Sequence, residues 1–358
     1  MIERMLTNFF NSKDKMPQKT NDSLKALTNI FDYNLAIQER PDNDPNIWWN
    51  NDYYGINYML KRYSGYKRAI VSEIEHGPNL DMECGDYEQS ASSSILTHSK
   101  QRADFLKHKG LKKIFFPIGT SIYYADMIFN DYDRAIIKEY LGRTLLVYPT
   151  HDIESYHFIQ DTEKFIEYVN EIKKECHYDN VLVSMYFVDI ERGQHLRFLK
   201  EGWTILSAGR RCNFDFGDVL KSIISLADFA IFQAYTSAIA FCTYMQVPSM
   251  IYNQKMTATR RGTDEVVRKF SWDDSAFQQF EELFKDYEDT ISKEKYDLCN
   301  YYFGYEEIMS PQDLYLLFGF MEELKSVKSQ KQILDLASKK KYESIRSRLN
   351  EAIEGVFV

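Results

Sequence analysis

Short apolar runs alternate with segments of helical periodicity between residues 67 and 253, and this alternation constrains the fold more than any other feature of the chain. Strand–helix alternation with short connections is typical of parallel sheets wound right-handedly and covered by helices. The runs predicted as strands are 68–74, 93–98, 112–119, 144–149, 181–187, 204–209, 229–234 and 248–253.

The alternation stops near residues 131–142 and restarts at TLLVYP, residues 144–149. We therefore predict an α/β fold with two Rossmann-like domains and a helical C-terminal tail. The expected domains are 1–140, which includes a helical N-terminal segment with a helix at 23–38, and 141–310. Residues 311–358 are expected to form helices that pack back on the first domain, starting after a Ser310 cap with Pro311 at the first helical position.

Charge and cysteine content exclude several classes of protein. Lys and Arg number 44 against 53 Asp and Glu, a net charge of −9, so a basic field for nucleic acid is absent. Five scattered cysteines favour reduced thiols in a cytoplasmic protein. We find neither a signal peptide nor a membrane-spanning stretch. The basic tail is either a solvated helical face or a surface attracted to anionic lipid at the inner membrane face.

Ligands of open parallel sheets bind at the carboxyl ends of the strands, so polar residues that follow predicted strands are the candidate site residues. In the first half, Glu75 and His76 follow the strand at 68–74. A histidine beside a carboxylate can act as a general base or bind an anion. The alternative is a loop histidine with structural hydrogen bonds only.

Three segments of the second half carry further candidates. PTHDIES follows the strand at 144–149 and can meet a phosphate or a sugar, but its spacing matches no zinc pattern, and no metal is predicted. Arg210 and Arg211 follow Gly209 and suit a phosphate, unless they pair with Asp215 or Asp218. Thr236 and Ser237 precede a predicted helix, where they either bind an anion or cap the helix. The candidates of PTHDIES are Thr150, His151, Asp152 and Glu154.

Motifs of other nucleotide-binding and hydrolytic enzymes are missing from the sequence. It contains no GxxxxGK[ST] phosphate loop, no GxGxxG fingerprint and no GxSxG elbow. P-loop kinases, simple dehydrogenases and serine hydrolases are therefore disfavoured.

The segments IEHG, ILTHSKQR, KKIFFPIGTSIYYAD, LLVYPTHDIES and SAGRRCNFDFGDVLKSIISLADFAIFQAYTSAIAFCTYMQVPSMIY together resemble GT-B glycosyltransferases of bacterial capsule and O-antigen biosynthesis. The resemblance covers residues 68–320. It implies that Arg210, Arg211, Thr236 and Ser237 lie near the phosphates of a nucleotide-sugar donor, and that IEHG lies near the acceptor. Gly119 and Tyr123 become cleft candidates, with Tyr123 standing where related segments have a histidine.

The sequence thus predicts a transferase that moves a sugar from a nucleotide sugar to a growing surface glycan or lipid-linked glycan. The donor class, hexosyl or sialyl/Kdo-type, stays open, and no cofactor is expected. The arginines and the Thr236–Ser237 helix would stabilise the leaving nucleotide. His76, Glu75 or Asp152 would take the acceptor proton. The alternatives are a nucleotide-sugar 2-epimerase-like isomerase and a non-catalytic polysaccharide-assembly protein.

Overall fold

Two parallel sheets organise the protein, which we describe from a computed structural model. The structure describes residues 30–45, 47, 51–77, 80, 90–152, 156–254, 257–260, 263, 266, 275–327 and 329–354. The first sheet has the order β1-β2-β3 and the second the order β7-β6-β4-β8-β9. Counted along the chain, the second order is 3-2-1-4-5, the doubly wound arrangement of a Rossmann-like unit. The predicted fold class is confirmed.

The first sheet and its surroundings come from the N-terminal part of the chain. Parallel neighbouring strands need a crossover connection, and α5 is the crossover between β2 and β3. The elements are α3 (Tyr33–Ala36), η2 (Tyr53–Gly55), α4 (Ile56–Ser64), β1 (Glu73–Ile74), β2 (Ser94–Thr97), α5 (Lys100–His108), β3 (Ile114–Pro117), α6 (Ser121–Tyr124) and α7 (Asp131–Leu141).

The second sheet follows from Thr144 onward. Its elements are β4 (Thr144–Tyr148), β5 (Tyr156–Ile159), α8 (Thr162–Glu175), β6 (Asn180–Ser184), α9 (Phe187–Glu191), α10 (Leu196–Lys200), β7 (Thr204–Leu206), α11 (Phe216–Ile224), β8 (Phe229–Phe232), α12 (Ala238–Tyr244), β9 (Ser249–Ile251), β10 (Thr257–Arg260) and α13 (Ser275–Leu283).

The chain then returns to the first sheet through a series of helices. Among them, α15 contacts α4 and α17 contacts β3. The predicted cap of α15 is confirmed, because Ser310 Oγ accepts a hydrogen bond from Asp313 N at 3.1 Å and Pro311 is the first helical residue. The elements are α14 (Lys293–Phe303), η5 (Tyr305–Glu307), α15 (Pro311–Leu324), α16 (Gln330–Ala337), η6 (Lys340–Ile345) and α17 (Arg346–Ile353).

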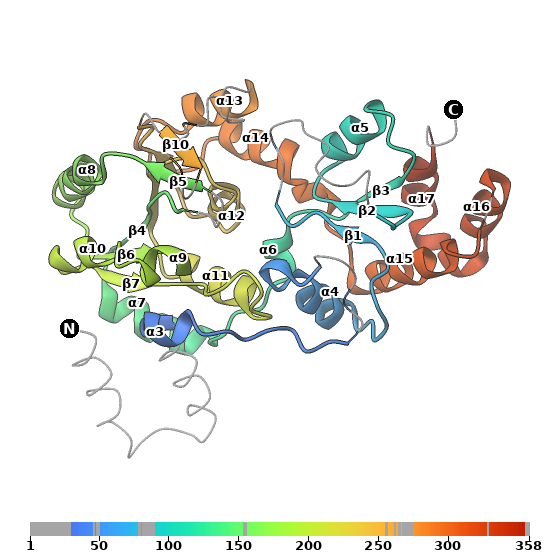
Figure 1. The fold of residues 1–358 in the computed structure, drawn as a ribbon, viewed down its shortest axis with the longest axis horizontal. Helices are drawn as coiled ribbons and strands as arrows, with labels where there is room; N and C mark the ends of the chain where they lie inside the picture. The colour runs from blue at the N-terminus through green and yellow to red at the C-terminus, as the bar shows by residue number, and fades with distance from the viewer. Residues whose placement is uncertain are drawn as a thin grey trace, which may run out of the picture.

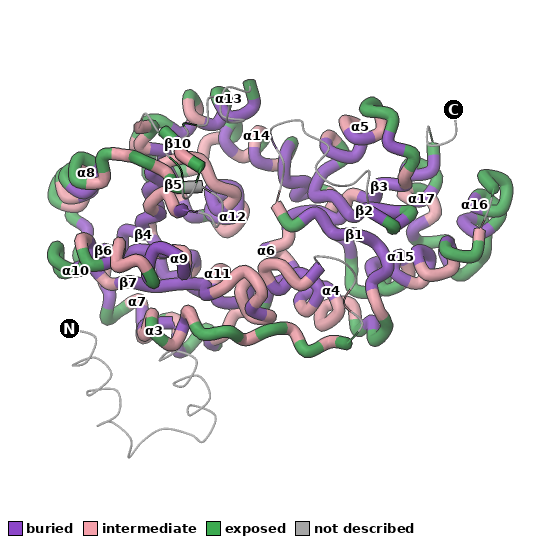
Figure 2. The backbone as a smooth tube through the Cα atoms, viewed as in Figure 1, coloured by how far each residue is buried: buried purple, intermediate pink, exposed green. Residues whose placement is uncertain are grey.

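The sheets are buried on both faces, as Figure 2 shows for their strands. Along β4, Leu145 and Val147 belong to one apolar core, while Leu146 and Tyr148 belong to the core on the other face. Successive side chains of a strand point to opposite faces, so an uninterrupted apolar run marks a strand covered on both sides. A separate core joins the first sheet to the C-terminal helices.

The two sheets lie side by side along the long axis in Figure 1, with α4, α6 and α11 between them. Contacts join these three helices pairwise. Because α4 and α6 belong to the first part of the chain and α11 to the second, this three-helix contact connects the two halves.

Three predictions of secondary structure needed correction. The strand expected at 68–74 is only Glu73–Ile74, because the Asn51 side chain takes the place of a neighbouring strand. Its amide donates to Ser72 O at 2.8 Å, and its oxygen accepts from Ile74 N at 2.9 Å. The antiparallel pair β5–β10 was not expected, because its strands are about a hundred residues apart. Of the helix expected at 23–38, residues 30–31 and Tyr33–Ala36 are helical, and Asp32 separates them as the cap of the second segment; residues 23–29 lie outside the described residues.

Candidate functional site

A cavity of about 270 Å³ lies where the carboxyl ends of both sheets meet. The described residues that line it come from the ends of β1, β4, β6 and β7, from η2, α4 and α6, and from the starts of α11 and α12. They are Tyr54, Met59, His76, Gly77, Ser121, Ile122, Tyr148, Pro149, His151, Ser184, Met185, Tyr186, Ala208, Gly209, Phe216, Gly217, Leu220, Thr236, Ser237, Ala238 and Phe241.

The second sheet places this cavity at its topological switch point. Strands β4 and β8 are neighbours, but the chain leaves them toward opposite edges of the sheet. Such a point opens a crevice at the carboxyl edge, where ligands bind. Gln233, which follows β8, joins the ends of the two strands, because its side-chain oxygen accepts a hydrogen bond from Thr150 N at 3.1 Å.

Thr236 and Ser237 line the cavity at the start of α12, as their predicted role as anion ligands requires. Thr236 Oγ1 accepts a hydrogen bond from Ala238 N at 3.1 Å, whereas the Ser237 side chain makes no capping bond. The ordinary cap therefore accounts for Thr236 only. The first turn of α12 brings both hydroxyls to the cavity wall, and hydroxyls can donate to an anionic oxygen.

His76 lines the opposite wall, at the end of β1. Its ring packs edge-on against Tyr53, with 5.0 Å between centroids, and lies 6.0 Å from the Tyr54 ring. Arg211 reaches the same place from the second half, with its guanidinium 4.5 Å from the centre of the Tyr53 ring. Loss of hydration at the cavity edge, followed by the positive charge of Arg211, lowers the pKa of His76. A neutral imidazole at neutral pH is suited to accept a proton.

Tyr54 also belongs to this wall, although it was not among the predicted site residues. Its backbone adopts φ +58°, a left-handed conformation that is unfavourable in free energy for a residue that carries a side chain. Its ring packs against Phe216 of α11, with centroids 4.9 Å apart. The Tyr-Tyr-Gly sequence, with Gly55 also left-handed, is the one signal that could have indicated a turn here.

The third side of the cavity carries aromatic rings and hydroxyl groups. His151 follows β4, and its ring centroid lies 4.8 Å from that of Tyr186. Tyr148 and Ser184 stand at the ends of the paired strands β4 and β6. Burial raises the pKa of Tyr148 well above its ordinary value, so that its phenol keeps its proton even at alkaline pH. Apart from His151, these residues were not predicted as site residues, because their runs are typical of sheet interior.

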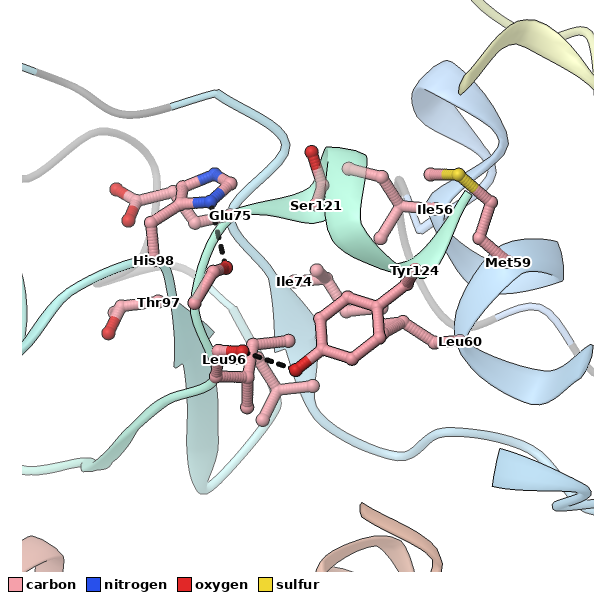
Figure 3. A pocket seen from close by; sticks show the side chains of 12 residues that line it. Ile56, Met59, Leu60, Ile74, Glu75, Leu96, Thr97, His98, Ser121 and Tyr124 are labelled. Carbon is pink, nitrogen blue, oxygen red and sulfur yellow. Dashed lines mark hydrogen bonds between the residues drawn. The ribbon is translucent and has the colours of Figure 1, made fainter. Parts of the chain in front are cut away.

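Glu75, predicted as a possible base, belongs to the interior of the first domain instead. Its Oε1 accepts from Arg102 Nε at 2.7 Å, and the two side chains are 1% and 3% exposed. Figure 3 shows Glu75 beside His98, whose Nδ1 contacts the carbonyl oxygen of Gly119 at 3.3 Å. Glu75 does not line the cavity, and its carboxylate is paired with Arg102 of α5.

Asp152 is also occupied by partners within the fold. Its carboxylate accepts from Phe158 N and His157 Nδ1, both at 2.8 Å, and from Arg192. Its own N–H donates to Asp189 Oδ1 at 3.2 Å. Through these contacts Asp152 ties the loop after β4 to β5 and α9, and it does not line the cavity.

Burial raises the pKa of Asp189 to about 7, and the negative charge of Asp152 contributes less to this increase. The hydrogen bond from Asp152 N–H lowers the pKa but does not outweigh burial. Asp189 is 5% exposed, so its desolvation is substantial. This carboxyl titrates near neutral pH directly behind the cavity wall.

Arg210 was predicted beside the donor phosphates, but it points to other partners. It donates to Ile37 O at 2.9 Å, pairs with Glu191, and lies 4.4 Å from the centre of the Phe187 ring. It does not line the cavity. Arg210 does not form the alternative ion pair with Asp215 or Asp218 either; those carboxylates pair with Arg40 and Arg62.

The remaining predicted residues divide between the cavity surroundings and the fold. Gly119 has φ +86°, and an added Cβ would lie 2.9 Å from Gly304 O, so glycine is needed for packing. Tyr123 OH lies 3.3 Å from Tyr63 OH in a tyrosine cluster. Neither residue lines the cavity, and neither does Thr150. Glu154 lies outside the described residues.

Within the described ranges, no three His, Cys, Asp or Glu side chains are grouped so that they could hold a metal ion. In the same part of the chain, no helix has the length and apolar character required to cross a bilayer.

Comparisons with known proteins give little beyond the geometry. No protein-family model matches the chain, and no curated protein matches it. Among solved structures, the chain is similar to the wall teichoic acid polymerase TagF, with 11% sequence identity and a TM-score of 0.35. The match covers 67% of this chain and 60% of that one.

Proposed function

We propose that the protein is a GT-B type glycosyltransferase that moves a sugar from a nucleotide-sugar donor to a growing bacterial surface glycan. One observation carries this proposal. The cavity is built from the carboxyl ends of two parallel sheets, with His76 on one wall and Thr236 and Ser237 on the other. Such a cleft can hold a donor against one sheet and an acceptor against the other.

Each wall supports one half of the transfer. In the reaction, the bond between the sugar and the donor phosphate breaks, and the nucleotide leaves with the bonding electrons. The Thr236 and Ser237 hydroxyls would donate to the phosphate oxygens that gain charge. The acceptor hydroxyl attacks the sugar carbon, and His76 would receive its proton. Arg211 is not a lining residue, but its charge acts on His76 and would add a positive potential for an anionic ligand.

The first experiment measures nucleotide binding. CMP, UDP and GDP are each added to the protein, and the melting temperature is followed, because a ligand that binds only the folded state raises it. We expect one nucleotide to give the largest shift, and a Thr236→Ala, Ser237→Ala double variant to lose most of that shift. Ser326→Ala is the control, since this exposed hydroxyl bonds to Glu323 O at 2.8 Å outside the cavity.

The second experiment separates transfer from its alternatives. The protein is incubated with nucleotide sugars, with and without glycan acceptors. Sugar transfer that requires an acceptor supports the proposal. Epimerised nucleotide sugar formed without an acceptor would indicate a 2-epimerase-like isomerase instead. Nucleotide binding without either product would indicate a polysaccharide-assembly protein, and the absence of any nucleotide binding would refute the proposal.

Lipid attachment of the acceptor and contact with the inner membrane face belong to the same proposal. The basic tail supports it only in part, because Lys339 and Lys341 both pair with Glu323. Sedimentation with vesicles that contain anionic lipid tests this contact directly.

A further inference from the structure

The two halves of the protein approach each other unusually closely along one side of the cavity. This seam consists of η2 and α4 in the first half and residues 211–221 in the second. Two glycines make the approach possible. A Cβ added to Gly55 would lie 2.2 Å from Phe214 O, and one added to Gly217 would lie 2.3 Å from Met59 Sδ. Both distances are shorter than any real contact. At Gly55 the obstacle is backbone, so a side chain there would push the halves apart, whereas at Gly217 the Met59 side chain would have to move away.

One arginine joins the three helices of this seam. Arg62 of α4 binds the Asp218 carboxylate with two nitrogens, and its Nη2–Oδ1 distance is 2.9 Å. Its Nε reaches Asp126, directly after α6, at 2.8 Å. The Asp126 N–H also donates to Asp218 Oδ1 at 2.8 Å, so the three groups form a closed network. Arginine alone among side chains offers the planar fork that such two-pronged binding needs.

Each helix held by this network contributes to the cavity wall. Met59 comes from α4, Ser121 and Ile122 come from α6, and Leu220 comes from α11. Residues 126 and 218 are 92 positions apart, so the network joins walls that local structure cannot align. Lys221 adds bonds from α11 to the carbonyl oxygens of Tyr123 and Ala125.

We propose that Arg62 is a positioning residue that holds the α4 and α11 walls of the cavity at a set separation before any ligand enters. The seam acts as a fixed joint, and the ligand meets a preformed wall on this side. A ligand therefore does not have to use part of its binding free energy to bring the two halves together. This inference does not depend on the chemical identity of the ligand.

Small-angle X-ray scattering of the full chain tests the fixed joint. The variants are Arg62→Ala, which removes the network, and Arg62→Lys, which keeps the charge but not the fork. Arg134→Ala is the matched control, because Arg134 pairs with Asp131 on the surface of α7 and is not among the residues that line this cavity. We expect Arg62→Ala to raise the radius of gyration by about 1 Å over the roughly 20 Å of a compact chain of this length. The control should match the parent.

Adding CMP, UDP or GDP gives the second readout. The parent should scatter alike with and without nucleotide. The Arg62→Ala variant should contract when a nucleotide binds and should bind it at least about ten-fold more weakly, with Arg62→Lys in between. Asp218→Asn, measured in parallel, keeps the test decisive if Arg62→Ala does not fold.

Unchanged scattering by the variants, or contraction of the parent with nucleotide, would overturn the fixed joint. If no nucleotide binds the parent, the function proposed above fails, and the scattering of the free variants still decides this inference.

Discussion

Replacing Gly55 by alanine gives a sharp test of how closely the two halves pack, because Gly65 provides an internal control. Both glycines are left-handed, with φ +69° and +73°, so alanine meets a similar backbone cost at each. That cost is about 1–2 kcal/mol. At Gly65 an added Cβ has no neighbour within 4 Å, and we expect the backbone cost alone.

At Gly55 the added Cβ would lie 2.2 Å from Phe214 O and 3.2 Å from Asn213 O. The obstacle is backbone of the other half, and it cannot rotate away as a side chain could. Phe214 is itself held, since its N–H donates to Arg40 O at 2.9 Å. Forcing an extra carbon into a packed contact costs about 1–3 kcal/mol, so Gly55→Ala should destabilise the protein by about 2–5 kcal/mol in total.

Urea denaturation followed by circular dichroism measures both variants against the parent. The difference between Gly55→Ala and Gly65→Ala isolates the contact between the halves. If the two variants lose the same stability within about 0.5 kcal/mol, then η2 does not pack on residues 213–214 as described, and the reasoning about the seam is refuted.

Three further predictions concern the site and its surroundings. Glu75→Ala should destabilise the protein by about 3–5 kcal/mol, because the Arg102 charge stays buried without its carboxylate partner. In urea denaturation, the double variant with Arg102→Met should regain most of this stability, and a loss below about 1 kcal/mol in the single variant would contradict the buried ion pair. The pKa of Asp189 is about 7 in the folded protein, against an ordinary value of 3.8, so between these pH values the folded protein binds more protons than the unfolded chain. The free energy of unfolding should therefore fall as the pH rises from about 4 to about 7. Melting temperatures measured across that range should lose this slope in Asp189→Asn, and a slope that persists would assign it to another group. His76→Ala should lower the turnover of sugar transfer by about 10²–10⁴-fold and leave nucleotide affinity nearly unchanged. The control His108→Ala, at the exposed end of α5, should alter neither quantity, and full turnover in His76→Ala would show that His76 is not the base.

Local signals determined most of the secondary structure. The strands at 114–117, 144–148 and 229–232 lie within the predicted runs, because a strand buried on both faces must be apolar throughout. Helix caps such as Ser310 with Pro311 were equally readable, since capping involves neighbouring residues only. The restart of the alternation at Thr144 correctly separated the two sheets. The domain boundaries at 140 and 310 stay predictions.

Only the tertiary structure decided which polar residues after the strands face the cavity. Glu75 and His76 are adjacent in sequence, yet Glu75 binds Arg102, 27 positions away, and His76 lines the cavity. Asp152 and Arg210 were equally plausible from sequence, but Arg192 and Glu191 occupy them. A charged side chain takes the partner that best compensates its loss of hydration, and that partner is set by packing between distant segments.

The seam between the two halves also depends partly on local sequence and partly on tertiary contacts. The sequence by itself determined that a cleft forms at the carboxyl ends of two parallel sheets, because the order of strands and helices leaves few topologies. The separation of its walls depends on Arg62 meeting Asp218, 156 positions away, and on Gly217 meeting Met59. Periodicity and capping extend over a few residues, whereas these contacts exist only after both halves have folded and packed together.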